Sequence, residues 1–391
     1  MTIDALDNLL DGVNSTERVN EWEPFHLLRN PFPSRAQPVW DVFYNQEDAR
    51  RAFNEDLRDF LLPRPDAHGG HNQTLLLAGG NRVGKTHFMQ HHRRVLERVL
   101  PPRQVLLPMA IVSTEGADTQ RFVEQAIAQW IDSVARQSGG SLFDASLVTA
   151  VDASDLPSGD VRRIAQAIQQ APAAQQPEIA ELARRWATGE RLRVGDRRKL
   201  DVHSNVEDAS TALDALAGLV RLQVLADGVG KVRRPGLLLF LDEFEVVFTA
   251  RRDRRDLFFV VLRELIDACG EGGLFLCVGM TTGQVEVRRL EIEYPALYAR
   301  LKGSRELPQL SQVKDTLDAR GYVHAFIEHG QRAFVATRSG RKLKTPAALL
   351  GDDEIRDVFE SIGQGRPIAQ GDFFDGVRRA ADDKVARPTK P

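Results

Sequence analysis

The sequence predicts an α/β fold with a doubly wound, mostly parallel sheet, a large helical insertion and a mainly helical C-terminal domain. Short apolar runs alternate with segments of helical periodicity along most of the chain, as in strand–helix–strand units. A glycine-rich loop follows the first run, and two acidic residues follow the third. In open parallel sheets both positions lie at the edge where ligands bind.

Four apolar runs are the expected strands. They are residues 74–78, 104–113, 237–241 and 273–280, and residues 305–308 could begin a fifth. Such short apolar runs are typical of strands that are buried on both faces of a sheet. Pro108 lies inside the second run. It predicts an edge position or a bulge, because proline has no N–H to donate to a sheet.

The remaining segments divide the chain into three parts. Residues 1–45 are expected to form an N-terminal extension, in which Pro31 and Pro33 favour an extended path. Residues 46–310 are expected to form the sheet domain, with the helical insertion at about 119–235, and residues 311–391 a separate helical domain. Helical periodicity is clearest at residues 46–62, 84–100, 206–227 and 254–269.

Composition excludes several classes of protein. The chain has 391 residues, of which 42% are hydrophobic and 27% charged, as in ordinary globular proteins. Its two cysteines, Cys269 and Cys277, cannot build a disulfide framework. No apolar run reaches the roughly 18 residues of a membrane span, and the acidic N-terminus does not resemble a signal peptide. We therefore expect a cytoplasmic protein. Its net charge of −3 confines any nucleic-acid contact to local patches.

The loop after the first expected strand matches the phosphate-binding pattern G-x-x-x-x-G-K-[ST]. Its residues are Gly79, Gly80, Asn81, Arg82, Val83, Gly84, Lys85 and Thr86, and His87 follows in the next helix. The glycines let backbone N–H groups and the helix N-terminus face a phosphate. Lys85 would reach the β- and γ-phosphates, and Thr86 would bind Mg²⁺. The alternative is a chance glycine-rich turn, which the flanking strand and helix disfavour.

The third expected strand ends in two acidic residues, Asp242 and Glu243. Asp242 would emerge at the carboxyl edge of the sheet and hold Mg²⁺. Glu243 is the candidate general base that deprotonates the attacking water. The alternative is an acidic N-cap of the following helix. Since no N-K-x-D guanine motif is present, the expected cofactors are ATP and Mg²⁺.

This pairing of a P-loop with adjacent aspartate and glutamate resembles AAA+ and related P-loop ATPases. The resemblance implies an AAA+-like ATPase domain and a C-terminal lid domain. Thr281 stands where these proteins place a γ-phosphate sensor, often asparagine, and Arg300 stands where they place an arginine finger. Such a finger acts on a neighbouring subunit's ATP, which implies a homo-oligomer, and Arg305 is the alternative finger. Arg366 resembles the lid arginine of origin-recognition-type ATPases, although its order with Pro367 is reversed.

A narrower resemblance is to the ATP-binding proteins of bacterial BREX-type phage-defence loci. These proteins share a segment like Trp186 to Glu190, then a helix, then a strand that ends in Asp-Glu-x-Glu, where Glu245 fills the last position. Residues 294–301 resemble a later segment of the same proteins. The likeness implies a role in defence against phage DNA, alongside other defence-system proteins.

Two basic clusters could contact DNA phosphates. One comprises Arg251, Arg252, Arg254 and Arg255, and the other comprises Arg338, Arg341, Lys342 and Lys344. A solvated charged surface is the alternative for each cluster.

Three function classes remain open. They are a DNA-associated ATPase, a nucleotide switch or scaffold that seldom hydrolyses ATP, and a transposition-type ATPase that selects targets. Glu243 favours hydrolysis over a pure switch, since a switch needs no general base.

Overall fold

The computed structural model describes most of the chain. The described residues are 20–34, 39–62, 72–138, 143–157, 159–270, 272–281, 284–302, 307–338 and 345–386. They divide into two compact units, one formed by residues 46–311 and the other by residues 1–45 together with 312–391. None of the described helices combines the length and the apolar character that crossing a bilayer requires.

The larger unit is built on a parallel sheet, so the α/β prediction is confirmed. Its described strands are β1 Gln73–Gly79, β2 Met109–Ser113, β3 Leu237–Asp242 and β4 Leu274–Thr281, in the order β1-β4-β3-β2. Gln309 forms a parallel bridge with Ala78, so the chain returns along the outer side of β1. The expected fifth strand is therefore a single bridge at this point, and residues 303–306 lie outside the described residues.

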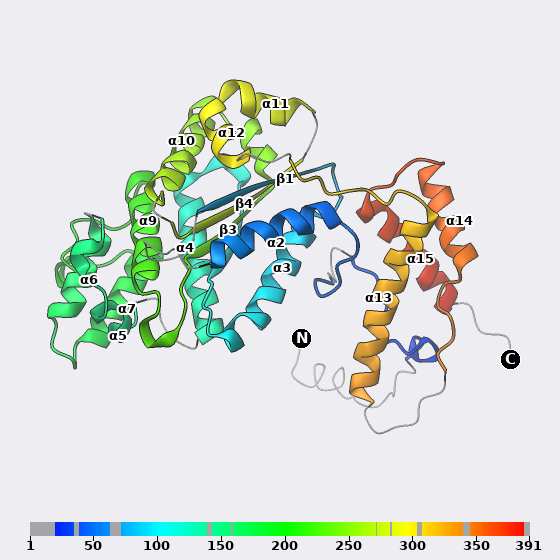
Figure 1. The fold of residues 1–391 in the computed structure, drawn as a ribbon, viewed down its shortest axis with the longest axis horizontal. Coiled ribbons are helices and arrows are strands. Elements are labelled where there is room, and N and C mark those ends of the chain that lie inside the picture. The colour runs from blue at the N-terminus through cyan, green and yellow to red at the C-terminus, as the bar shows by residue number, and fades with distance from the viewer. Residues whose placement is uncertain are drawn as a thin grey trace, which may run out of the picture. The chain divides into compact units, whose positions relative to one another are not determined.

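Helices cover both faces of this sheet (Figure 1). Helices α2 Glu47–Leu61 and α3 Lys85–Val99 cover one face, where Phe53 of α2 stacks on Phe240 and Phe275 at 6.0 and 5.4 Å between ring centroids. Alternate strand residues, such as Leu239 and Leu276, belong to the core on the other face. Side chains of successive strand residues point to opposite faces, so each strand is apolar throughout.

The insertion between β2 and β3 is helical, as its periodicity predicts. Its helices are α4 Thr119–Ser138, α5 Ala145–Thr149, α6 Asp160–Gln170, α7 Gln176–Ala187, α8 Val194–Lys199 and α9 Ala209–Leu225. After β3 come the short 3-10 helix η6 Phe244–Thr249 and α10 Arg252–Ala268, and after β4 come α11 Gln284–Glu293 and α12 Pro295–Lys302. Trp130 and Trp186 are fully buried where α4, α7 and α9 meet.

Strand β2 lies at the edge of the described sheet, as Pro108 predicts, and α4 covers its open side. The side-chain amide of Gln129 accepts from the N–H of Ile111 at 2.9 Å and donates to its C=O at 2.7 Å. Gln137 makes the same pair of bonds with Leu107, and the Ser133 hydroxyl accepts from the N–H of Met109. Helix side chains thus replace a neighbouring strand and satisfy an edge that would otherwise be open to pairing.

The smaller unit joins the N-terminal segment to the C-terminal helices. Its helices are α13 Thr316–Thr337, α14 Asp352–Gly363 and α15 Gln370–Ala386, preceded by the short 3-10 helix η1 Glu23–Phe25. Phe25, Leu27 and Phe32 are buried in the same core as these helices. Tyr44 packs edge-on against Tyr322 of α13, with 4.8 Å between ring centroids. The segment before residue 46 therefore shares a core with the C-terminal helices.

We expect Gln129→Ala to destabilise the larger unit. The substitution leaves the N–H and C=O of Ile111 without their partner, at a cost of about 1–3 kcal/mol in the free energy of unfolding. Urea unfolding followed by tryptophan fluorescence measures this cost, in a background where Trp22 and Trp40 are replaced by phenylalanine so that the signal comes from Trp130 and Trp186. Gln125→Ala on the same helix is the matched control, since no backbone bond of β2 depends on it. Equal stability of the two variants would contradict the role of Gln129.

Candidate nucleotide site

The parallel register brings four strand ends to one edge of the sheet. Gly79 of β1 is paired with Thr281 of β4, and Ser113 of β2 is paired with Asp242 of β3. The loop that begins at Gly79 leads directly into α3. A phosphate-binding loop, a carboxylate and two hydroxyls therefore meet where open α/β sheets bind ligands.

The loop conformation depends on residues at positive φ. Gly84 has φ 95° and Arg82 has φ 59°, values in the left-handed region that glycine adopts without strain. A Cβ added to Gly79 would lie 2.7 Å from Cγ2 of Val83 and 3.2 Å from Cβ of Leu310. Gly79 therefore permits the tight packing of the loop against the returning chain. This geometry presents the N-terminus of α3 to an anion.

Lys85 is buried, with 9% of its surface exposed. Its ammonium group donates to the carbonyl oxygens of Gly80 and Gly79 at 2.9 and 3.2 Å. Burial lowers the pKa of Lys85, and the nearby carboxylates of Glu245, Asp242 and Glu243 oppose that shift. A phosphate would supply further negative charge to this dehydrated ammonium group.

Thr86 and Asp242, the two expected Mg²⁺ ligands, are in direct contact. The Thr86 hydroxyl donates to Oδ2 of Asp242 at 2.6 Å, and the N–H of Glu243 donates to Oδ1 at 3.0 Å. Burial raises the pKa of Asp242, and these two bonds oppose the increase. One hydroxyl and one carboxylate suit Mg²⁺, which takes oxygen ligands and usually keeps several waters and substrate phosphates in its coordination sphere. The pair fits the metal.

Glu243 lies beside Asp242 but points toward strand β2. It has φ 57°, its side chain is exposed, and Oε2 lies 3.4 Å from the Ser113 hydroxyl. The buried Thr114 hydroxyl donates to its backbone carbonyl at 2.9 Å. A positive φ is uncommon outside glycine, and here it turns the Glu243 carboxylate to the solvent side of the site.

Thr281 lies beside the P-loop but its hydroxyl is already bonded. It donates to the Glu245 carboxylate, and the N–H of Thr281 donates to the same carboxylate at 2.9 Å. Sequence reasoning identified Glu245 only as a motif position and did not identify Ser113 and Thr114. The sequence did carry a signal for Ser113 and Thr114, because these polar residues come at the end of the second expected strand, where ligands bind in parallel sheets.

Arg300 lies beside the amino ends of the strands, at the opposite end of the sheet from the P-loop. Its backbone carbonyl accepts from Thr74, near the start of β1, which is roughly 16 Å from Gly79 at the usual rise of a strand. Its guanidinium group binds both carboxylate oxygens of Asp267, at 2.7 and 3.0 Å. Arg300 therefore cannot reach the P-loop of its own chain. The alternative finger, Arg305, lies outside the described residues.

The other expected site residues fall in different places. Arg366 is exposed just after α14, in the smaller unit. Arg338 is also in that unit, where it pairs with Glu23 at 3.2 Å. Arg341, Lys342 and Lys344 lie outside the described residues. Arg255, of the other basic cluster, is less exposed than Arg251 and Arg254. Its side chain is only 13% exposed and donates to the hydroxyl of Tyr294 at 2.9 Å.

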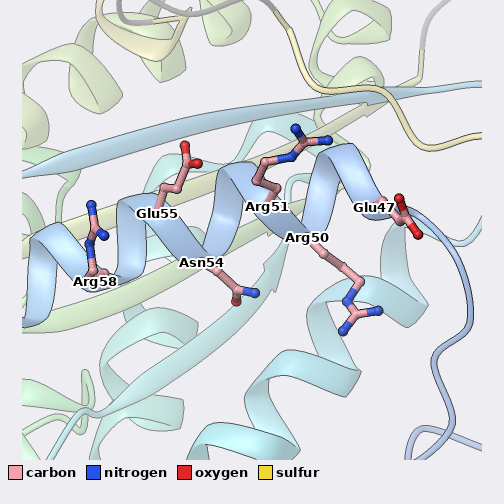
Figure 2. A pocket seen from close by; sticks show the side chains of 6 residues that line it. All are labelled: Glu47, Arg50, Arg51, Asn54, Glu55 and Arg58. Atoms are coloured by element: carbon pink, nitrogen blue, oxygen red, sulfur yellow. The ribbon is translucent and has the colours of Figure 1, made fainter.

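A hollow along α2 is separate from this site. Figure 2 shows its lining side chains, which are Glu47, Arg50, Arg51, Asn54, Glu55 and Arg58. Arg51 and Glu55 project to one side of the helix, and Arg50 and Asn54 to the other (Figure 2). None of them belongs to the P-loop or to the strand ends. In the part of the chain that the structure describes, no cluster of three or more His, Cys, Asp or Glu is placed to hold a metal.

Together these features define a P-loop nucleotide-binding protein of the α/β class. The chain belongs to the family of the BREX system ATP-binding proteins BrxC/D, whose model matches residues 113–319, just over half of the chain. That range contains Asp242, Glu243, Thr281 and Arg300, and it begins after the P-loop. No curated protein matches the sequence significantly.

Three solved structures to which the chain is similar come from Aeropyrum pernix and Pyrococcus abyssi. The ORC1 protein of Aeropyrum pernix in complex with DNA is 16% identical, with a TM-score of 0.45 over 94% of this chain and 65% of that chain. The ORC2 protein of the same organism, in ADPNP-ADP complexes, is 12% identical, with a TM-score of 0.43 over 93% and 73%. The Walker-type ATPase of Pyrococcus abyssi is 13% identical, with a TM-score of 0.34 over 91% and 75%. Likeness at this level carries no conclusion about activity.

We expect Lys85→Met to weaken binding of Mg²⁺·ATP by about a hundredfold, because it removes charge-assisted hydrogen bonds to phosphate while retaining the buried aliphatic chain. Calorimetry measures the affinity, and a thermal melt shows whether the variant is folded. Unchanged affinity in a folded variant would contradict the assignment of the phosphate site.

Proposed function

We propose that this protein hydrolyses ATP with Mg²⁺ at the P-loop and that it acts on or near DNA in the cytoplasm with other BREX proteins. The observation that carries the proposal is the 2.6 Å contact between Thr86 and Asp242. This contact joins the P-loop helix to the acidic end of β3, so Thr86 and Asp242 would together hold the metal ion. When bound, Mg²⁺ supplies charge neutralisation to the phosphates.

Glu243 is the proposed general base. Its carboxylate is exposed and follows the metal-binding aspartate directly. To act on a water at the γ-phosphate, the side chain has to turn from Ser113 toward the P-loop. That rotation breaks a contact of 3.4 Å, which is too long for a strong hydrogen bond.

We expect Glu243→Gln to retain ATP binding and to lower the rate of hydrolysis by about two to four orders of magnitude, because glutamine cannot accept the water's proton. Phosphate release under saturating Mg²⁺·ATP measures the rate, and calorimetry confirms binding. If the variant hydrolyses ATP at the wild-type rate, Glu243 has a structural role. A wild-type protein that binds ATP without turnover supports the nucleotide-switch alternative.

The Arg300 finger is proposed to act between copies of the chain. Its place at the amino edge of the sheet separates it from its own P-loop, so the P-loop it serves has to belong to a neighbour. The bidentate pair with Asp267 has to open for this role, and a partly exposed pair of this kind contributes only about 0–1 kcal/mol. An arginine supplied in trans increases phosphoryl transfer by about 10³ to 10⁵.

We expect Arg300→Ala to bind ATP and hydrolyse it slowly, and its mixture with Lys85→Met to recover part of the activity. In the mixture one variant supplies an intact P-loop and the other an intact finger. Specific activity of the mixture, measured over a range of total concentration, is the test. No recovery on mixing, with a monomer by light scattering, would exclude the trans arrangement.

DNA contact is proposed at the start of α10, where Arg251 and Arg254 are exposed. We expect the double substitution Arg251→Gln with Arg254→Gln to weaken DNA binding and to reduce the slope of log affinity against log salt by about 1.8, the value for two phosphate contacts. The matched control is Arg191→Gln with Arg193→Gln, an exposed pair in the insertion. A loss confined to the control would place the contact in the insertion instead.

The transposition-type alternative shares the same site chemistry. Membership of the BREX family favours a DNA-associated ATPase over an ATPase that selects targets for transposition. A transposase gene beside the coding sequence would support target selection, whereas neighbouring defence genes would support the BREX role.

A further inference from the structure

Glu245 is held at the edge of the nucleotide site by a short 3-10 helix that packs on the core. It lies in the first turn of η6, between Phe244, which is fully buried, and the turn that contains the buried Val247 and Phe248. These apolar side chains fix η6 against the core on the β4 side of the sheet. Glu245, taken as a whole residue, is half-buried. The side chain can therefore rotate while the η6 backbone stays in place.

Both oxygens of this carboxylate are bonded to one residue. Oε2 accepts from the N–H of Thr281 at 2.9 Å, and Oε1 accepts from the Thr281 hydroxyl. Hydrogen bonds to an ionised acceptor are about twice as strong as neutral ones. Glu245 therefore determines which way the Thr281 hydroxyl points.

Thr281 lies beside the start of the P-loop. It is paired in register with Gly79, where the P-loop begins. Burial lowers the pKa of Lys85, and Glu245 is the carboxylate that opposes this shift most. Glu245 thus lies within electrostatic reach of the ammonium group that would bind the β- and γ-phosphates. Thr281 and Lys85 flank the same space.

A hydroxyl group has one proton to donate. While the Thr281 hydroxyl donates to Glu245, it cannot donate to a phosphate oxygen. The γ-phosphate of ATP is a second anionic acceptor for this proton, whereas ADP has no phosphate at that position. The backbone N–H of Thr281 can remain bonded to Glu245 when the hydroxyl turns, so the strand end keeps its position.

We propose that Glu245 is a positioning residue that competes with the γ-phosphate for the Thr281 hydroxyl proton, and so sets how strongly the site distinguishes a nucleoside triphosphate from a diphosphate. This inference rests on the proposed binding of ATP at the P-loop, and it places the γ-phosphate beside Thr281 because Thr281 is paired with Gly79 at the start of that loop. It assigns no step of hydrolysis to Glu245. The contact acts as a latch, which the triphosphate has to open and the diphosphate leaves closed.

The test measures the dissociation constants of the full chain for ADPNP and for ADP, each with Mg²⁺, by calorimetry. Glu245→Gln offers a neutral, weaker acceptor, so the ratio of the ADP constant to the ADPNP constant is expected to rise about fivefold. Thr281→Val lacks the hydroxyl, so the ratio is expected to fall. In the Thr281→Val background, Glu245→Gln is expected to change the ratio no further.

Two further variants separate the latch from a general effect of charge. Glu245→Asp keeps the negative charge but shortens the reach to Thr281, so it is expected to raise the ratio as Glu245→Gln does. Thr281→Ser keeps the hydroxyl, so it is expected to retain the wild-type ratio and the full response to Glu245→Gln. Thermal melts establish that each variant is folded.

Several outcomes would overturn the proposal. An equal gain in affinity for ADP and ADPNP in Glu245→Gln would show that Glu245 does not distinguish the two nucleotides. The same rise in the Thr281→Val background would show that the effect bypasses the hydroxyl. A wild-type ratio in Thr281→Val would overturn the latch and leave hydrolysis through Glu243 intact, because the readout is binding and not turnover. A wild-type chain that binds neither nucleotide would overturn both proposals.

Discussion

The parallel register of the sheet is the constraint on which the nucleotide site depends. Because β1, β4, β3 and β2 all run in one direction, their carboxyl ends lie along one edge. The P-loop, Thr281, Asp242 and Ser113 thereby become neighbours although they are distant in sequence. The apolar runs that bury each strand on both faces hold this register in place, so the chemistry at the edge depends on packing beneath it.

Burial couples the charges of the site to one another. Dehydration lowers the pKa of Lys85 and raises that of Asp242, so each charged form depends on the groups around it. Three side-chain donors at this edge already have acceptors: Lys85 has the loop carbonyls, Thr86 has Asp242, and Thr281 has Glu245. Nucleotide binding is therefore an exchange of hydrogen bonds, and affinity reflects the difference between the old and the new partners.

The carboxyl ends and the amino ends of the strands hold different functional groups. The carboxyl edge holds the P-loop and the acidic residues, and the amino edge holds Arg300 in its pair with Asp267. The length of the strands keeps these groups apart within one chain, which suits an arginine that serves another copy. The lateral edge at β2 is closed by Gln129 and Gln137 of α4. A helical insertion thus protects the edge strand that ends beside Glu243.

The sequence by itself determined the strands, the main helices, the P-loop and the acidic pair, because apolar periodicity and glycine-rich loops are local signals. It predicted neither the bond between Glu245 and Thr281 nor the pairing of Gln129 with Ile111. It also did not show that Phe32 and the N-terminal segment share a core with the C-terminal helices. Only the tertiary structure decided these contacts. Each of these contacts joins residues that are distant in sequence. The local sequence pattern around each residue is compatible with many partners, and the packing of the distant elements selects one of them.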